Sequence, residues 1–380
     1  MPTPSTRQEF KSSFDSWPRE SLATREDPLG PGSSWDIREI ETFQILRKPP
    51  KRRLPLLLGP YIVDATAWIE ESEDMQSAIR LSEQNWRNCT HQQLGERAGK
   101  FASFFTFLAQ VLENPLDSDP RRELRIQHSA NSAGPVLSSS PPQPPSRSSL
   151  PSSPIQPPNK KIRQARSSES YFPSDQSDQS TYDHRAKSEI TTNACVYELL
   201  RCVTELLRRQ TEPSVYLEWS ITHDTFTVDA GALKYSTTND GGLIHKAHRG
   251  GYWQRASKYS YCSIESKSWY DVDEKPTSVQ AQEAAHLIGM FSQGAPRSNP
   301  QHETILPLVS TAQNIFSLVL GRFPADYARY LQDGYQCEDG VFVEIEECGM
   351  FELQEPSDLR SIFTIIVALH LWLQSIGPKV

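Results

Sequence analysis

A proline- and serine-rich segment divides this chain of 380 residues. Between residues 131 and 160, 18 of 30 residues are proline or serine, and no aromatic residue occurs between Phe107 and Tyr171. Such a stretch buries too little apolar surface to offset the entropy that is lost on ordering. We therefore predict a disordered linker over residues 115–188, with structured parts before and after it.

The charge and cysteine content exclude several classes of protein. With a formal net charge of -8, the chain does not coat nucleic acid by bulk charge, because phosphate neutralisation needs clustered lysine and arginine. The six cysteines have no CxxC spacing, which is typical of reduced thiols and argues against structural zinc. The longest apolar run, residues 361–373, is too short to span a bilayer. We expect an intracellular protein without a membrane segment.

The part before the linker is predicted to be a polar, disordered tail over residues 1–40 and a helical region over residues 41–114. Helices are expected at 72–87 and 92–113, since apolar residues recur there at three- and four-residue steps. Their apolar face could pack on the second part of the chain or bind a protein partner.

Two short basic clusters, residues 47–53 and 159–166, have the composition of nuclear import signals. A solvated run of charges accounts for each cluster equally well. The clusters therefore leave a nuclear location open.

The part after the linker, residues 189–380, has the patterns of an α/β or α+β domain. A turn signal, "TNDGG" at 238–242, predicts a hairpin between two of its strands. Helices are expected at 193–210, 278–292, 304–320 and 357–375, and strands at 215–221, 225–236, 242–248, 259–269 and 341–347.

The strand "YSYCSIESKSW" at 259–269 carries the strongest candidate for a catalytic site. Alternate side chains of a strand share a face, so Glu265 and Lys267 project together. A carboxylate beside an ammonium group can hold a divalent cation and orient a water molecule. The second carboxylate is expected from Asp229, in a neighbouring strand. Asp240 is the competitor, but we place it in a turn, where aspartate bonds to its own backbone.

This order of elements resembles the PD-(D/E)XK nuclease superfamily, whose core is αβββαβ. The segments "VDAG", "HKAHRGGYW", "YCSIESK" and "AQEAAHLIGM" are similar to those of fungal PD-(D/E)XK nuclease-like proteins, over about residues 190–376. The resemblance implies a restriction-endonuclease-like core with extra C-terminal helices. It also implies an endonuclease that depends on Mg²⁺ or Mn²⁺ and acts on DNA. The alternative that it implies is a catalytically inactive module that binds nucleic acid or protein.

Carried over by position, the resemblance makes Asp229, Glu265 and Lys267 the catalytic residues. Asp229, Glu265 and the backbone carbonyl of Ser266 would hold the metal, and Lys267 would position the attacking water. The proline of the family motif is replaced here by Val228.

Accessory positions are less well defined by the resemblance. Gln280 and Gln282 fall where such nucleases often place a polar side chain, and Asp240 remains an alternative acid. Many members also use an acid on the first helix, but Glu198 and Glu205 lie opposite the apolar face of that helix.

The segment "HKAHRGGYWQRASK" at 245–258 combines basic and aromatic residues. Basic side chains neutralise phosphates and an aromatic ring stacks on an unpaired base, so this segment could contact nucleic acid. An ordinary exposed loop explains it equally well. The candidate contact residues are Lys246, His248, Arg249, Arg255 and Lys258.

Overall fold

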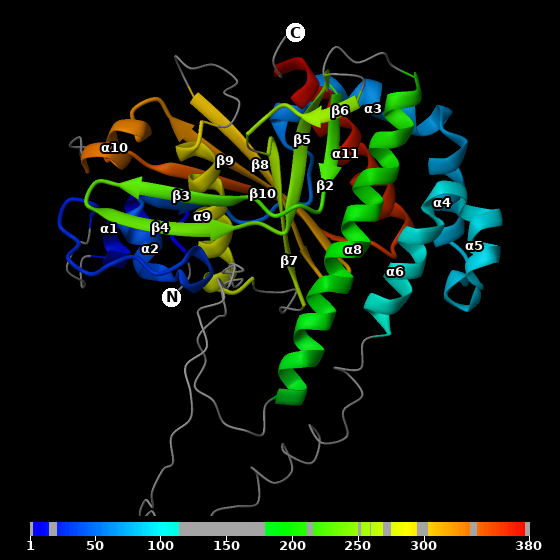
Figure 1. The fold of residues 1–380 in the computed structure, drawn as a ribbon, viewed down its shortest axis with the longest axis horizontal. Helices are drawn as coiled ribbons and strands as arrows, with labels where there is room; N and C mark the ends of the chain where they lie inside the picture. The colour runs from blue at the N-terminus through cyan, green and yellow to red at the C-terminus, as the bar shows by residue number, and fades with distance from the viewer. Residues whose placement is uncertain are drawn as a thin grey trace, which may run out of the picture. The chain divides into compact units, whose positions relative to one another are not determined.

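A mixed β-sheet is the centre of the structure, a computed structural model (Figure 1). Its strands are β1 (Ile45–Arg47), β2 (Tyr216–Ser220), β5 (Gly241–Arg249), β6 (Tyr252–Arg255), β7 (Cys262–Lys267), β8 (Glu303–Ala312), β9 (Ile315–Pro324) and β10 (Val343–Glu352). Their order is β1-β10-β9-β8-β7-β5-β2, and β6 pairs with β5. The strands β2, β5 and β7 pair antiparallel, whereas β7 and β8 are parallel. The chain therefore has the mixed α/β fold that the sequence predicts.

The described residues on both sides of the predicted linker belong to one compact unit. The linker lies outside the described residues, except for its last part, 179–188, where the helix α8 (Gln179–Gln210) begins. The structure describes residues 3–14, 21–113, 179–210, 216–249, 252–258, 260–268, 275–294, 303–334 and 340–376.

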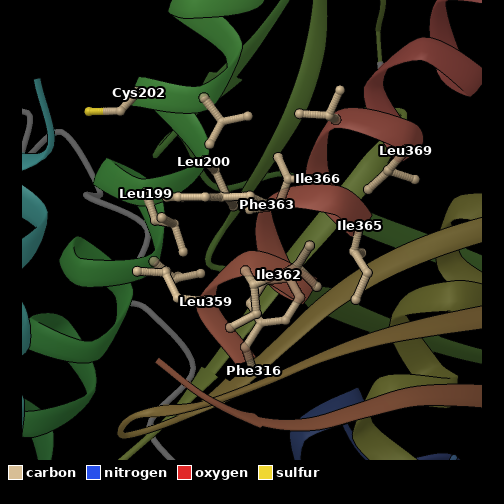
Figure 2. Close-up of a cluster of buried hydrophobic side chains, with 14 of the residues drawn as sticks. Leu199, Leu200, Cys202, Phe316, Leu359, Ile362, Phe363, Ile365, Ile366 and Leu369 are labelled. Carbon is tan, nitrogen blue, oxygen red and sulfur yellow. The ribbon is translucent and has the colours of Figure 1, made fainter. Parts of the chain in front are cut away.

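One face of the sheet is covered by α8, by α11 (Pro356–Ile376) and by helices of the N-terminal part. In Figure 2, Leu199 and Leu200 of α8 face Phe363 and Ile366 of α11. The N-terminal helices are α3 (Ile62–Glu71), α4 (Glu73–Ser82), α5 (His91–Ala98) and α6 (Ala102–Leu112). By length and composition α11 could cross a membrane, but 67% of its most apolar window is buried. It serves here as a core helix.

The other face carries α1 (Arg7–Phe14), α2 (Ile37–Thr42), α9 (Thr277–Ser292), α10 (Tyr327–Asp333) and a hairpin of β3 (Thr225–Ala230) and β4 (Leu233–Thr238). The prediction of a disordered tail over residues 1–40 is wrong for residues 3–14 and 21–40, which the structure describes. Trp35 is buried between Phe43 and Tyr235, and the side chains of Asp36 and Glu39 cap α2. One aromatic anchor and a helix cap thus hold a polar segment on the core.

The hairpin predicted around residues 238–242 is also wrong. The chain turns earlier, at Gly231, whose φ of +60° favours glycine, and β3 pairs with β4 in a separate two-stranded sheet. The following strand, β5, leaves this hairpin and pairs with β2 and β7. The hairpin β3–β4 is thus inserted between neighbouring strands of the main sheet.

The helix predicted at 304–320 is in fact the hairpin β8–β9, which turns at Gln313 (φ 50°). Both strands are buried along nearly their whole length. A strand that is buried on both faces has no polar alternation, so its apolar run cannot be told from a buried helix by periodicity.

A ring of four buried charges joins β1 to α9 and β10. Nη2 of Arg47 lies 2.6 Å from a carboxylate oxygen of both Glu283 and Glu347, and Nζ of Lys275 lies 2.7 Å from the other oxygen of each. Each residue is at most 7% exposed. Burial alone would raise the pKa of Glu347, but the charges of Lys275 and Arg47 lower that pKa to about 2. The ring ties the N-terminal part to the rest of the unit.

We predict that Arg47→Met lowers the free energy of unfolding by about 3–5 kcal/mol, because it leaves two buried carboxylates with one cation. Lys48→Met, at the residue directly after β1, is the matched control, since the side chains of Lys48 and its partner Glu344 are 38% and 41% exposed. Loss of this pair should cost less than about 1 kcal/mol. Urea unfolding measures both, and a similar small loss in both variants would contradict the role of the ring.

Candidate functional site

Glu265 and Lys267 lie side by side on β7 and are in contact. Nζ of Lys267 is 2.6 Å from Oε1 of Glu265, and Nε2 of His286, on α9, is 2.8 Å from Oε2. The Glu265 side chain is 2% exposed, so both of its oxygens face cationic or hydrogen-bonding groups within the protein. Thr237 of β4 holds the other ring nitrogen of His286, at 3.1 Å.

The charges of this pair stabilise one another. Burial alone would raise the pKa of Glu265, but Lys267 and His286 together lower that pKa to about 2. Burial alone would lower the pKa of Lys267, yet the neighbouring Glu265 raises it well above its ordinary value. Glu265 is therefore ionised and Lys267 protonated at neutral pH.

Asp240 is the second carboxylate that the structure brings to this pair. It directly precedes β5, where its amide donates to the carbonyl of Ile264 at 3.0 Å. Its Oδ2 accepts a hydrogen bond of 2.8 Å from the amide of Ser266, between Glu265 and Lys267. Burial, and then the charge of Glu265, raise the pKa of Asp240 to about 6. The carboxylates of Asp240 and Glu265 thus lie close enough for the charge of Glu265 to oppose the ionisation of Asp240.

Asp229 does not lie in this cluster. It belongs to β3, which pairs with β4 rather than with a strand of the main sheet. Its side chain is 75% exposed and forms an ion pair of 3.1 Å with Lys234. The prediction that Asp229 neighbours Glu265 is therefore wrong, because the strand that precedes β7 in the sheet is β5.

The helix α8 holds the backbone around the two carboxylates. Nδ2 of Asn193 donates to the carbonyl of Asp240 at 2.9 Å, and the hydroxyl of Ser266 donates to Oδ1 of Asn193 at 3.5 Å. The hydroxyl of Thr311, on β8, donates to that of Ser266 at 3.2 Å. Asn193 of α8 thus contacts both Asp240 and Ser266, and Thr311 of β8 contacts Ser266 as well.

An acid of the first helix does approach the site, but it was not among those considered from the sequence. Glu189 lies one turn before Asn193 in α8, and its charge contributes to raising the pKa of Lys267. Glu198 and Glu205 instead form ion pairs with Arg201 of the same helix. Glu189 precedes the helix predicted at 193–210, so the sequence did not place it on that helix, whereas α8 begins at Gln179.

On α9 the side chain that reaches the site is His286, not either predicted glutamine. Gln280 donates to the carbonyl of Lys275 at 2.8 Å and so closes the start of the helix, while Gln282 is half-buried. Glu283 and His286 are fully buried and lie three residues apart. The sequence signal for these two side chains was their spacing, since Glu283 and His286 lie on one helix face within the otherwise apolar "AQEAAHLIGM".

The predicted basic loop is largely a hairpin, β5–β6. Lys246 lies 2.5 Å from Glu218, and Arg255 forms bonds of 2.7 Å with each carboxylate oxygen of Asp224. Lys246 is six residues after Asp240, roughly 20 Å along β5 at strand spacing. Both cations are therefore partly neutralised, and Lys246 lies away from the carboxylates.

The same hairpin presents an exposed aromatic ring. Trp253 is 52% exposed and stacks on Tyr216 with ring centroids 4.4 Å apart, in a geometry that suits stacking of an unpaired base. Lys258 is exposed nearby in the chain. The side chains of His248 and Arg249 lie outside the described residues.

The donors at the site suit a hard divalent cation. Within the described ranges, no three carboxylate, imidazole or thiol groups converge as a ready-made metal cage. Mg²⁺ typically takes only one or two carboxylates and completes its shell with water and phosphate oxygens. Asp240 and Glu265 are two such carboxylates, and Asp240 is joined to the E-x-K segment by the hydrogen bond that it accepts from the Ser266 amide.

Comparison of the chain with models of known protein families and with curated proteins finds no match in either. The functional argument therefore depends on the geometry and charge of this site.

We predict that Asp240→Asn stabilises the protein at pH 7.5 by about 1–3 kcal/mol. The folded-state pKa of about 6 lies above the ordinary value of 3.8, so ionisation of Asp240 opposes folding at neutral pH. That penalty should shrink as the pH falls from 6 toward 4. Urea unfolding of both proteins across this range measures the difference, and a difference that does not change with pH would contradict the shift.

Proposed function

We propose that the chain is a Mg²⁺- or Mn²⁺-dependent phosphodiesterase of the restriction-endonuclease-like type, acting on DNA at Asp240, Glu265 and Lys267. The observation that carries this proposal is the hydrogen bond from the Ser266 amide to Asp240. It places the acid that starts β5 against the E-x-K segment of β7.

The order of elements supports the proposal. When the hairpin β3–β4 and the short strand β6 are both treated as insertions, α8, β2, β5, β7, α9 and β8 follow one another as αβββαβ. The three strands pair in succession, and α9 connects β7 to the parallel strand β8. In this arrangement "Asn239-Asp240" stands where the family has its proline and aspartate.

A divalent cation would supply positive charge against the pentacoordinate phosphate and a more acidic bound water. Asp240, Glu265 and the Ser266 carbonyl would hold it. His286 keeps the Glu265 carboxylate in place from α9. Asn193 holds the backbone of Asp240 in place by donating a hydrogen bond to its carbonyl.

Lys267 contributes as a cation and not as a base. Its raised pKa keeps the ammonium protonated at neutral pH, so it can only donate hydrogen bonds. Donation to the attacking water orients that water, and donation to a non-bridging oxygen stabilises the charge that develops on the phosphate. The proton released by the water must pass to another acceptor, such as solvent.

The DNA contact would be local, as the acidity of the whole chain requires. The proposed surface is the exposed Trp253 together with the exposed Lys258. We also propose an intracellular location. A nuclear import signal would then be residues 159–166, outside the described residues, because Arg47 of the other basic cluster is buried and Lys48 is paired with Glu344.

The direct test is nicking of plasmid DNA in Mg²⁺ or Mn²⁺. Asp240→Asn, Glu265→Gln and Lys267→Met should each lower the rate by about 100-fold or more, by removing a group that acts on the reacting phosphate. Asp229→Asn is the matched control and should retain the wild-type rate. Activity lost in Asp229→Asn but kept in Asp240→Asn, or nicking that is equal and metal-independent in all variants, would contradict the proposal.

A second candidate function is a non-catalytic module that keeps the fold to bind nucleic acid or protein. The favouring observation is that Lys267 and His286 already contact both oxygens of Glu265, so this carboxylate is compensated without a metal. Calorimetric titration with Mn²⁺ separates the candidates. The nuclease should bind the ion and lose that binding in Asp240→Asn, whereas an absence of binding by the wild type would favour the module.

A further inference from the structure

The ring of buried charges and the candidate site are neighbours beneath α9. Glu283 belongs to the ring and His286 touches Glu265, one helical turn further on. Ser310 of β8 connects them from the sheet, since it lies opposite Glu265 in the β7–β8 register and 3.4 Å from Nζ of Lys275. Ser310 on β8 and one turn of α9 thus lie between the site and the ring.

We propose that Arg47 is a positioning residue, which sets the contact between His286 and Glu265 through Glu283 and α9. Nη2 of Arg47 bridges Glu283 on the helix and Glu347 on β10. Without this bridge the two carboxylates would face each other with Lys275 as their one remaining cation in the ring, and like charges repel strongly where water is excluded. One turn of helix is rigid, so a displacement at Glu283 is passed to His286.

The chemistry of the ring favours positioning over stability alone. Nη1 of Arg47 is buried without a hydrogen-bond partner among the described residues, which is a cost that apolar packing at this place would avoid. Buried ion pairs are often no more stabilising than apolar side chains of similar volume, and their best-attested use is to fix one register. The bridge selects one placement of α9 over the sheet.

The role of the N-terminal part follows from this coupling. Residues 45–47 reach the sheet from before the linker and pair with β10, so this part of the chain completes the support of the site. The effect on catalysis rests on the proposed nuclease function. The coupling of Arg47 to His286 does not.

The experiment is side-chain ¹⁵N NMR of the full chain at neutral pH, with the resonances of His286 assigned from a His286→Gln variant. Arg47→Met should shift both ring-nitrogen resonances of His286, because the contact with Glu265 is altered, and Arg47→Lys should shift them less. Lys48→Met is the control for charge beside β1. Phe105→Leu, in the core across the sheet, is the control for lost stability, and both should leave His286 unchanged.

An unshifted His286 in folded Arg47→Met, or an equal shift in Phe105→Leu, would overturn the proposal. If Arg47→Met does not fold, Arg47→Met combined with Glu347→Gln removes the repulsion but still lacks the bridge from Arg47 to Glu283, so it should shift His286 by less than Arg47→Met would. No shift in this double variant would also overturn the proposal. In an active enzyme Arg47→Met should lower cleavage by about tenfold or more. A shift of His286 in a protein that cleaves nothing would support the coupling while the nuclease function fails.

Discussion

A buried carboxylate needs compensating charge, and the sheet beneath α9 carries two that are almost fully buried, Glu265 and Glu347. Each is ionised because cations lie within 3 Å of it. These cations come from β1, β7 and the segment before α9, so charge compensation requires elements from both ends of the chain to assemble at once. Residues that are distant in the sequence must therefore fold together before the charges of Glu265 and Glu347 are compensated.

The same constraint explains why the site and its support cannot be separated. His286 contacts Glu265, and Glu283, one turn earlier on α9, contacts Arg47 and Lys275. Ser310 on β8 lies opposite Glu265 and 3.4 Å from Nζ of Lys275. Asp240 is the one carboxylate at the site whose pKa is raised, to about 6. Glu265 is thus compensated by Lys267 and His286, whereas burial and the charge of Glu265 disfavour the ionisation of Asp240.

Much of the second part of the chain could be predicted from the sequence, because its elements have clear periods. The strand at 216–220 alternates, and α9 and α11 lie within two residues of their expected bounds. The hairpin β8–β9 could not be predicted in this way, since strands buried on both faces show no alternation. The N-terminal tail was missed because its order depends on tertiary contacts of a few residues, such as Trp35 in the core, and not on composition.

The E-x-K pair was identified correctly as two side chains in contact, but its acidic partner was not. The choice between Asp229 and Asp240 depended on which strands pair, and a turn signal at 238–242 concealed the earlier turn at Gly231. Asn193 and His286 were missed for a related reason. Neither has a motif, and only the packing of α8 and α9 on the sheet brings them to the carboxylates.

The central claim is that Asp240 and Glu265, not Asp229, share one cation. Anomalous diffraction from crystals grown with Mn²⁺ tests it most directly. The account predicts a peak that lies within about 2.0–2.3 Å of oxygens from both Asp240 and Glu265. A peak at Asp229, or no peak at Asp240 at saturating Mn²⁺, would contradict it.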